Sequence, residues 1–167
     1  PFTRGFGLLE GFLAKKRAQK ANNLTPDNLR TGIILDVGCG SYPYFLLNTK
    51  FKDKYGVDPS LKITSNQDIK LEKLDISKIS LPFKENTIDV VTMLAVFEHI
   101  DKDKLNLVLS NIYKILKQNG IFIITTPAPW ADKLLHNMAK IGLISSEEIH
   151  EHKTHYQRFE INDMLKK

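Results

Sequence analysis

The pattern of hydrophobic positions between residues 33 and 126 predicts a sheet of buried strands. Short apolar runs recur there, separated by helices or long crossovers, which is typical of parallel strands buried on both faces. The predicted strands cover 33–37, 54–58, 71–76, a run that ends at 92–94, and 121–126. Crossover connections between them predict a sheet order of 3-2-1-4-5 in an α/β fold of three layers.

Amphipathic segments between and after these strands predict helices. Apolar residues at helical spacing mark 102–118, and Asn119-Gly120 follows as the expected C-cap. The apolar run 44–47 suits a helix packed on the sheet, and 129–144 is predicted to form a helix after the fifth strand.

The N-terminal segment is also predicted to be an amphipathic helix, over residues 2–21. Its apolar stripe consists of Phe2, Phe6, Leu9 and Leu13, widened by Phe12. Either the stripe packs on the domain, or the helix lies weakly on a membrane surface or forms a lid over the cofactor. Residues 22–31 are interpreted as a linker in which Thr25-Pro26-Asp27 caps one short turn, so we divide the chain into 1–30 and 31–167.

Length and composition are those of one globular domain, with 167 residues, 42% hydrophobic and 26% charged. Residues 1–22 have five basic residues and one acidic residue, a charge of +4, which leaves about +1 of the total +5 for the remainder. A nucleic-acid partner is therefore not expected. One cysteine, no membrane-spanning run and no visible signal peptide favour a cytoplasmic protein, although the chain begins with Pro1 rather than Met.

The first strand leads into a glycine turn, Gly38-Cys39-Gly40, and then into the apolar run 44–47. Strand, glycine turn and helix predict a nucleotide-type cofactor site at the carboxyl end of a first parallel strand, because bare backbone lets a ligand approach closely. A dinucleotide site needs a third glycine where this chain has Pro43, which counts against a nicotinamide-dependent oxidoreductase.

The pattern Asp36-x-Gly38-x-Gly40 resembles motif I of class I S-adenosylmethionine-dependent methyltransferases. The phrase from Asp75 to Asp89, with L-P-F before an acid–valine strand, is similar to the methyltransferase type 11 family. This resemblance covers residues 31–126 and implies a Rossmann-like fold. It further implies S-adenosylmethionine as the cofactor, S-adenosylhomocysteine as the product, and methyl transfer to a small-molecule or carrier-conjugated acceptor.

Several acids and loop residues are expected to hold the cofactor. Asp58 closes the second strand at the separation from Asp36 where an acid meets ribose hydroxyls, and a helix cap or an Asp-Pro turn is the alternative. By resemblance, Asp75 and Ile76 flank the adenine, unless Asp75 only caps the following turn. The predicted cofactor-binding residues are Asp36, Gly38, Cys39, Gly40, Asp58, Pro59, Asp75, Ile76, Leu94 and Ala95.

Three residues are candidates for catalysis. By resemblance, Glu98 and His99 lie near the mouth of the acceptor site, and a base is needed only for a poorly acidic hydroxyl. His99 or His155 is the candidate base, with Glu98 orienting the acceptor or His99; alternatively, His99 only fixes its loop. The pattern H-x-H-x-x-H at 150–155 suits a metal, an acceptor pocket or structural histidines, and we expect no metal.

The C-terminal part of the resemblance is incomplete. A complete class I methyltransferase adds a sixth strand and an antiparallel seventh, and no strand pair is predicted in 127–167. We therefore expect the antiparallel hairpin to be missing, as in a truncated chain, which would expose strand five and favour a homodimer. A non-catalytic S-adenosylmethionine-binding or regulatory module is the alternative function.

Overall fold

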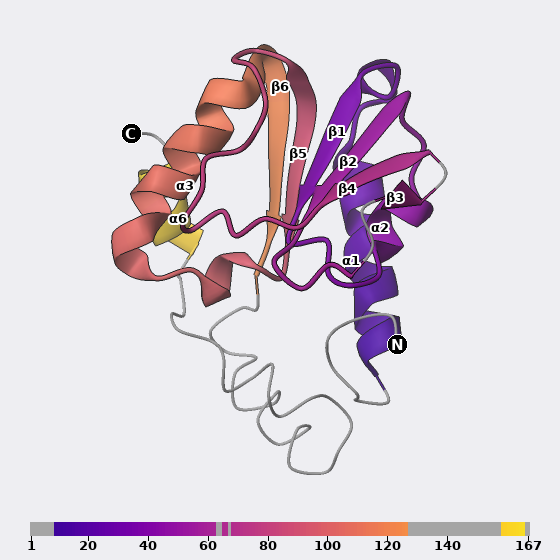
Figure 1. Cartoon of the computed structure of the whole chain (residues 1–167), viewed down its shortest axis with the longest axis horizontal. Coiled ribbons are helices and arrows are strands. Elements are labelled where there is room, and N and C mark those ends of the chain that lie inside the picture. The colour runs from indigo at the N-terminus through magenta and orange to yellow at the C-terminus, as the bar shows by residue number, and fades with distance from the viewer. Residues whose placement is uncertain (1–8, 63–64, 67, 127–157, 166–167) are drawn as a thin grey trace.

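The computed structural model describes residues 9–62, 65–66, 68–126 and 158–165, which form one sheet with helices on both faces (Figure 1). In chain order the elements are α1 (Glu10–Leu24), η1 (Asp27–Leu29), β1 (Ile33–Val37), α2 (Tyr44–Leu47), β2 (Asp53–Val57), β3 (Ser65–Asn66), β4 (Ile69–Glu72), β5 (Ile88–Leu94), η2 (Phe97–His99), α3 (Lys102–Ile115), β6 (Leu116–Thr125) and α6 (Arg158–Met164).

The described strands form one sheet in the order β3-β4-β2-β1-β5-β6. Neighbouring strands are parallel except the short β3, which pairs antiparallel with β4. The central strand β1 pairs on both sides, with Ile34 beside Lys54 of β2 and Val90 of β5. The predicted order 3-2-1-4-5 is confirmed, and β3 is an additional strand that the sequence pattern did not predict.

Side chains of the central strands fill two cores, one on each face of the sheet. Ile34 and Val90 belong to the core that includes residues of α1 and α2, whereas Leu35 and Val91 belong to the core that includes α3. All four side chains are fully buried. The apolar run of β1 therefore predicted correctly that this strand is buried on both faces, and β5 is buried in the same way.

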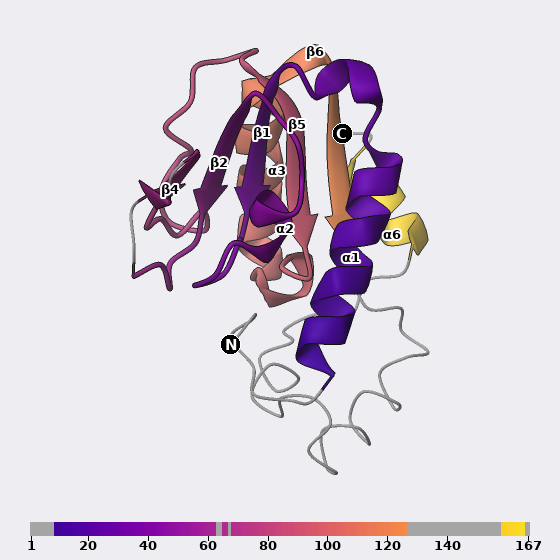
Figure 2. The same ribbon diagram turned by 90° about the vertical axis from the view of Figure 1, so that its right-hand side faces the viewer.

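The helices form one layer on each face of the sheet (Figure 2). Leu105, Val108 and Ile112 of α3 are buried against one face, and Ile161 and Met164 of α6 pack on the same core. α1 and α2 lie on the opposite face. This is the predicted three-layer, Rossmann-like sandwich.

α1 packs on the sheet through small side chains. Ala18 and Ala21 are buried, whereas Phe12 is 54% exposed. The expectation that Phe12 widens the packed stripe is therefore wrong, and Phe2 and Phe6 lie outside the described residues. Alanines let the helix approach β5, β6 and α2 closely. The helix also extends to Leu24, into the predicted linker, where η1 forms the predicted short turn.

The last described strand begins earlier than predicted. The helix predicted over 102–118 ends before Leu116, where β6 begins, so Asn119-Gly120 is not a helix C-cap. Leu116 pairs with Ile88 of β5, and the residues after it bridge a shift in register before regular pairing resumes. Tertiary strand pairing outweighs the local helix signal here.

The third predicted strand also has different limits. The prediction was 71–76, but β4 ends at Glu72, because the chain turns around Asp75, whose carbonyl oxygen accepts bonds from the amides of Lys78 and Ile79. The predicted helix at 129–144 and the histidine segment lie outside the described residues. The absence of a C-terminal hairpin stays a prediction, because 127–157 is not described.

Candidate functional site

β1 is followed by a turn with a backbone conformation that glycine adopts more readily than other residues. Gly38 and Gly40 have φ values of 76° and 75°, in the left-handed region. The amides of Gly38 and Cys39 both donate to the carbonyl oxygen of Val57 at the end of β2, at 2.8 and 3.3 Å. A Cβ on Gly40 would meet nothing nearer than the carbonyl oxygen of Tyr42 at 3.8 Å. The turn is thus fixed to β2 and leaves bare backbone at Gly40.

Asp58 directly follows β2 and supports this turn. Its carboxylate is buried, with residue exposure of 3%. Oδ2 accepts a bond from the Gly40 amide at 3.0 Å, and Oδ1 accepts bonds from the Ser60 amide at 2.7 Å and the Ser60 hydroxyl. The Asp-Pro turn that was the alternative interpretation is therefore formed, with Pro59 exposed. The same carboxylate also lies beside the glycine turn, as ribose binding requires.

Asp36 places a second buried acid close to the first. Its Oδ1 accepts a bond of 2.6 Å from the hydroxyl of Thr92 on β5. Burial raises the pKa of Asp36 to about 7; the bond from Thr92 opposes this rise, and the charge of Asp58 adds to it. Near neutral pH the carboxyl is therefore partly protonated, and a cation bound beside it would favour the ionised form.

Cys39 contributes backbone to the turn while its side chain points into the core with α1 and α2. Burial and the neighbouring charges of Asp36 and Asp58 raise the pKa of the thiol well above its usual range. A Cβ on Gly56 would come within 2.8 Å of the Cys39 sulfur. The thiol is a packing group, and only the Cys39 backbone is available to a ligand.

The loop after β5 turns sharply at Ala95, whose φ of 57° is uncommon for a residue with a Cβ. Its amide donates to the carbonyl and hydroxyl oxygens of Thr125, at 2.9 and 3.1 Å. The next residue, Val96, then lies over Gly38, where an added Cβ would come within 2.2 Å of Val96 Cγ2. The loop that begins after Leu94 is therefore packed against the glycine turn.

The short helical turn η2 contains two of the three predicted catalytic residues. Phe97 and Glu98 are buried, with Glu98 at 2% exposure, and His99 is half-buried. The His99 amide closes the turn on the carbonyl oxygen of Val96 at 2.9 Å. The third candidate, His155, lies outside the described residues. Among these three, His99 is the described residue with an accessible side chain.

Asp75 forms the turn cap that was the alternative to adenine binding. Its Oδ1 accepts bonds from the amide and hydroxyl of Ser77 at 3.0 and 2.7 Å, and Lys78 pairs with Oδ2 at 3.0 Å. These bonds from Ser77 and then Lys78 lower the pKa of Asp75 to about 2. Ile76 packs on the edge of the α3 core. Adenine binding by this pair stays a prediction.

Asp89 belongs to the phrase that suggested the family, but it lies at the amino ends of the strands, away from the glycine turn and Asp58 at their carboxyl ends. Its carboxylate accepts a bond of 2.8 Å from the amide of Ile33 at the start of β1, and Lys117 binds both oxygens at 2.8 and 2.9 Å. A Cβ on Gly32 would come within 2.1 Å of it. Asp89 therefore fastens the amino ends of β1 and β5 to β6.

The sequence did not identify Thr92, Val96 and Thr125, which support the predicted residues. Thr92 is fully buried between the apolar residues Val91 and Met93 of β5, and a buried hydroxyl signals a hydrogen-bond partner. Val96 and Thr125 give no comparable signal, because their contacts are with distant segments of the chain.

Metal-binding side-chain groups and membrane-spanning helices are two further features that the described part of the chain could contain. Within it, no group of three or more histidine, cysteine, aspartate or glutamate side chains is placed to hold a metal ion. The residues of the H-x-H-x-x-H pattern lie outside that part. Nor does any described helix have the length and apolar character needed to cross a membrane.

A family model for a methyltransferase domain matches residues 9–167, almost the whole chain. The chain belongs to this methyltransferase family. It is 34% identical over 98 residues to an uncharacterized protein of Methanocaldococcus jannaschii, and the match covers 59% of this chain and 42% of that protein. It is 27% identical over 150 residues to O-methyltransferase 3 of Dictyostelium discoideum, and the match covers 81% of this chain and 33% of that protein. The chain thus spans less than half the length of either relative.

The fold of this chain is similar to that of an S-adenosylmethionine-dependent methyltransferase from Archaeoglobus fulgidus. The TM-score is 0.67 at 18% identity, over 92% of this chain and 67% of that chain. The resemblance to class I methyltransferases of the type 11-like kind is confirmed, and S-adenosylmethionine is the cofactor that the family implies. Two buried carboxylates beside bare glycine backbone fit a cofactor with two cationic groups and a ribose diol.

Proposed function

We propose that the chain forms the catalytic fold of an S-adenosylmethionine-dependent methyltransferase that acts on a small-molecule or carrier-conjugated acceptor. The observation that carries this proposal is the convergence of Asp36, the glycine turn and Asp58 at the carboxyl ends of β1 and β2. Ligands of parallel α/β folds bind at that edge, and the acids there suit a positively charged cofactor.

Within this proposal, each predicted cofactor-binding residue contacts a particular part of the cofactor. The Asp58 carboxylate accepts both ribose hydroxyls, and the glycine backbone and Asp36 lie toward the methionine end. Asp75 and Ile76 flank the adenine, and the backbone of Leu94 and Ala95 lies along the cofactor. When bound, the cofactor supplies a methyl group already activated on a sulfonium.

The protein's share of the chemistry is alignment and exclusion of water. The packed contact between Val96 and Gly38 supports this role, because it fixes the loop after β5 relative to the glycine turn. His99, on the turn that follows, is proposed to take the proton of a hydroxyl acceptor. Glu98, the residue before His99, is buried, and it is proposed to orient either His99 or the acceptor.

Oxygen is the favoured acceptor atom, because the Dictyostelium discoideum relative is named an O-methyltransferase. A hydroxyl acceptor is also the case in which a base such as His99 or His155 has a role. A cytoplasmic location and a homodimer belong to the same proposal.

The test is methyl transfer from S-adenosylmethionine to a panel of phenolic and aliphatic hydroxyl compounds, measured as S-adenosylhomocysteine formed. With an accepted compound, His99→Ala is expected to lower kcat by roughly a hundredfold and to leave the Kd for S-adenosylhomocysteine unchanged. An undiminished kcat would remove His99 as the base. Cofactor binding without transfer to any compound would favour the non-catalytic module instead.

A further inference from the structure

The outward face of α1 presents a row of lysines to solvent. Lys15, Lys16 and Lys20, which we call the lysine stripe, are exposed, and Gln19 and Asn23 on the same face are exposed as well. Lys15 and Lys16 are followed at spacings of three to five residues by Gln19 and Lys20, which places these side chains along one side of the helix. The stripe is continuous over more than one helical turn.

An aromatic side chain lies at the amino-terminal end of the stripe. Phe12 is 54% exposed, and the ammonium of Lys16 lies 5.5 Å from the centroid of its ring. Lysines together with an exposed phenylalanine are typical of helices that lie at a membrane interface, where the apolar ring enters the boundary between headgroups and acyl chains.

The lysines of the stripe take no part in the ion pairs recorded between described residues. Those ion pairs involve Asp27, Asp75 and Asp89. Residues 1–22 account for +4 of the total charge of +5. An anionic surface would therefore meet a locally positive face on a domain that is otherwise almost neutral.

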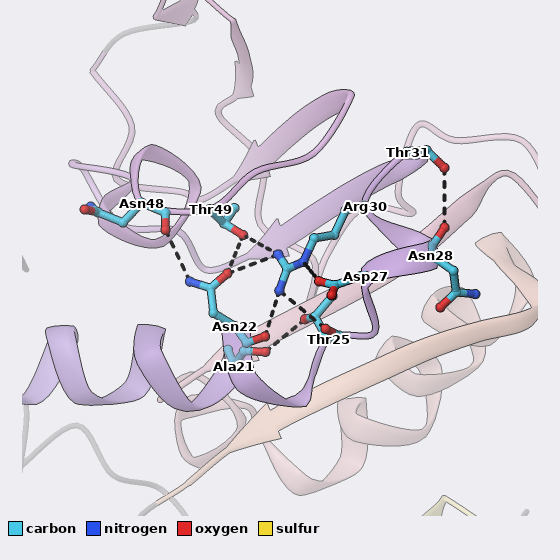
Figure 3. Close-up of polar contacts among 9 residues, drawn as sticks. All are labelled: Ala21, Asn22, Thr25, Asp27, Asn28, Arg30, Thr31, Asn48 and Thr49. Carbon is cyan, nitrogen blue, oxygen red and sulfur yellow. Dashed lines mark hydrogen bonds and ion pairs between the residues drawn. The ribbon is translucent and has the colours of Figure 1, made fainter.

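α1 is held firmly at its carboxyl end, so the stripe has a fixed orientation. The guanidinium of Arg30 donates to the carbonyl oxygens of Asn22 and Thr25 at 2.8 and 3.3 Å (Figure 3). It also donates to the side chains of Asn22 and Thr49, at 3.3 and 3.4 Å, and the Thr49 hydroxyl donates to Asn22 at 2.6 Å. These bonds join the end of α1 to the loop after α2.

The amino-terminal half of α1 extends beyond the edge of the sheet at which β1 and β2 end (Figure 2). That is the edge with the glycine turn and Asp58. A surface in contact with the lysine stripe would therefore lie near the cofactor end of the domain.

We propose that the lysine stripe and Phe12 dock this domain on an anionic phospholipid surface. The apolar side of α1 is already packed on the sheet through Ala18 and Ala21, so the helix lies on the surface and does not insert its own apolar face. Within the described α1, the exposed cations are lysines. A flexible ammonium group suits the diffuse field of anionic headgroups, whereas paired recognition of carboxylates on a protein partner favours arginine.

Docking in this orientation would supply the site with an acceptor from the lipid phase. This placement of the acceptor rests on the proposed methyltransferase function, whereas binding to lipid does not. The two can therefore fail separately in one set of measurements.

The test is sedimentation of the full chain with vesicles of phosphatidylcholine, with or without phosphatidylserine, at low and physiological ionic strength. The triple variant Lys15→Glu/Lys16→Glu/Lys20→Glu is compared with a matched control of equal charge change at exposed lysines elsewhere, Lys52→Glu/Lys102→Glu/Lys114→Glu. Thermal unfolding and titration with S-adenosylhomocysteine, for each variant, check that the fold and the cofactor site are unchanged.

The expected result is salt-sensitive binding of the wild type to phosphatidylserine vesicles alone. The stripe variant should bind these vesicles roughly tenfold more weakly than the wild type, and the control variant should lose much less vesicle binding. Equal losses in both variants, or no wild-type binding at low ionic strength, would overturn the proposal. Salt-sensitive retention on immobilised polyglutamate without vesicle binding would also overturn it, and would identify an acidic polypeptide as the occupant. A failed S-adenosylhomocysteine titration with intact vesicle binding would contradict only the methyltransferase function.

Discussion

The side chain of Val96 fills the space that a Cβ on Gly38 would need, with Cγ2 only 2.2 Å from that position. The contact joins the loop after β5 to the turn after β1, two segments expected to meet the cofactor. Their relative position is therefore set by packing between the two loops as well as by the sheet.

Replacing Gly38 with alanine should disturb both loops. The new methyl group would overlap Val96 and would sit at a φ of 76°, which together cost on the order of 2–4 kcal/mol. We expect Gly38→Ala to lower stability and to weaken S-adenosylhomocysteine binding, measured by urea unfolding and calorimetry.

Val96→Ala provides the matching half of a double-mutant cycle. In the Val96→Ala background the added methyl group at position 38 meets less, so part of the loss should disappear. Additive losses would show that the Val96–Gly38 contact does not couple the loops.

Ala95 is expected to tolerate glycine well, because its φ of 57° strains any residue with a Cβ. Ala95→Gly should raise the free energy of unfolding by up to about 1 kcal/mol, and the effect of Asn86→Gly, at a φ of 55° that asparagine adopts more easily, should be smaller. Urea unfolding compares the two. A clear loss of stability in Ala95→Gly alone would contradict the assignment of strain to Ala95.

Stability should depend on pH through Asp36. Its pKa is raised from 3.8 to about 7, so the folded protein binds more protons than the unfolded chain between these values. The contribution of Asp36 therefore decreases as pH rises from about 4 to about 7 and is level above that range. In Asp36→Asn, which can still accept the Thr92 bond, this dependence should vanish, with a gain on the order of 2 kcal/mol above neutral pH.

The control for Asp36 is Asp103→Asn, at an exposed acid in the first turn of α3. Its unfolding free energy should follow the wild-type pH profile. If Asp36→Asn also follows that profile, the buried carboxyl does not have the raised pKa.

Asp89 should matter for stability and not for the cofactor. Its carboxylate binds the Ile33 amide and Lys117 at the amino edge of the sheet, and Lys117 is 44% exposed, so the ion pair is partly screened. Asp89→Asn is expected to cost roughly 1–2 kcal/mol in urea unfolding while the Kd for S-adenosylhomocysteine stays unchanged.

The parts that the sequence predicted well depend on local pattern. The apolar run of β1, the glycines of the following turn and the acid that closes β2 are each recognisable within a few residues. Leu116 was misassigned because its pairing with Ile88 overrides a helical pattern that is itself strong.

Contacts between distant residues were less predictable. The bond from Thr92 to Asp36 joins residues 56 positions apart, and Asp89 reaches Ile33 over the same separation. The phrase from Asp75 to Asp89 suggested the family without a role for Asp89, and the sheet places Asp89 at the amino ends of the strands and Asp58 at the carboxyl ends. Only the topology separates the structural acid from the candidate cofactor acids.

The most direct test of the central claim is calorimetric titration of S-adenosylhomocysteine into the wild type, Asp58→Asn and Asp89→Asn. The wild type and Asp89→Asn should bind alike. Asp58→Asn should bind about tenfold more weakly, because the amide has one acceptor oxygen and no charge where the carboxylate has two charged acceptor oxygens for the diol. A folded wild type that binds NADH and not S-adenosylhomocysteine, or an Asp58→Asn variant that binds as tightly as the wild type, would contradict the account.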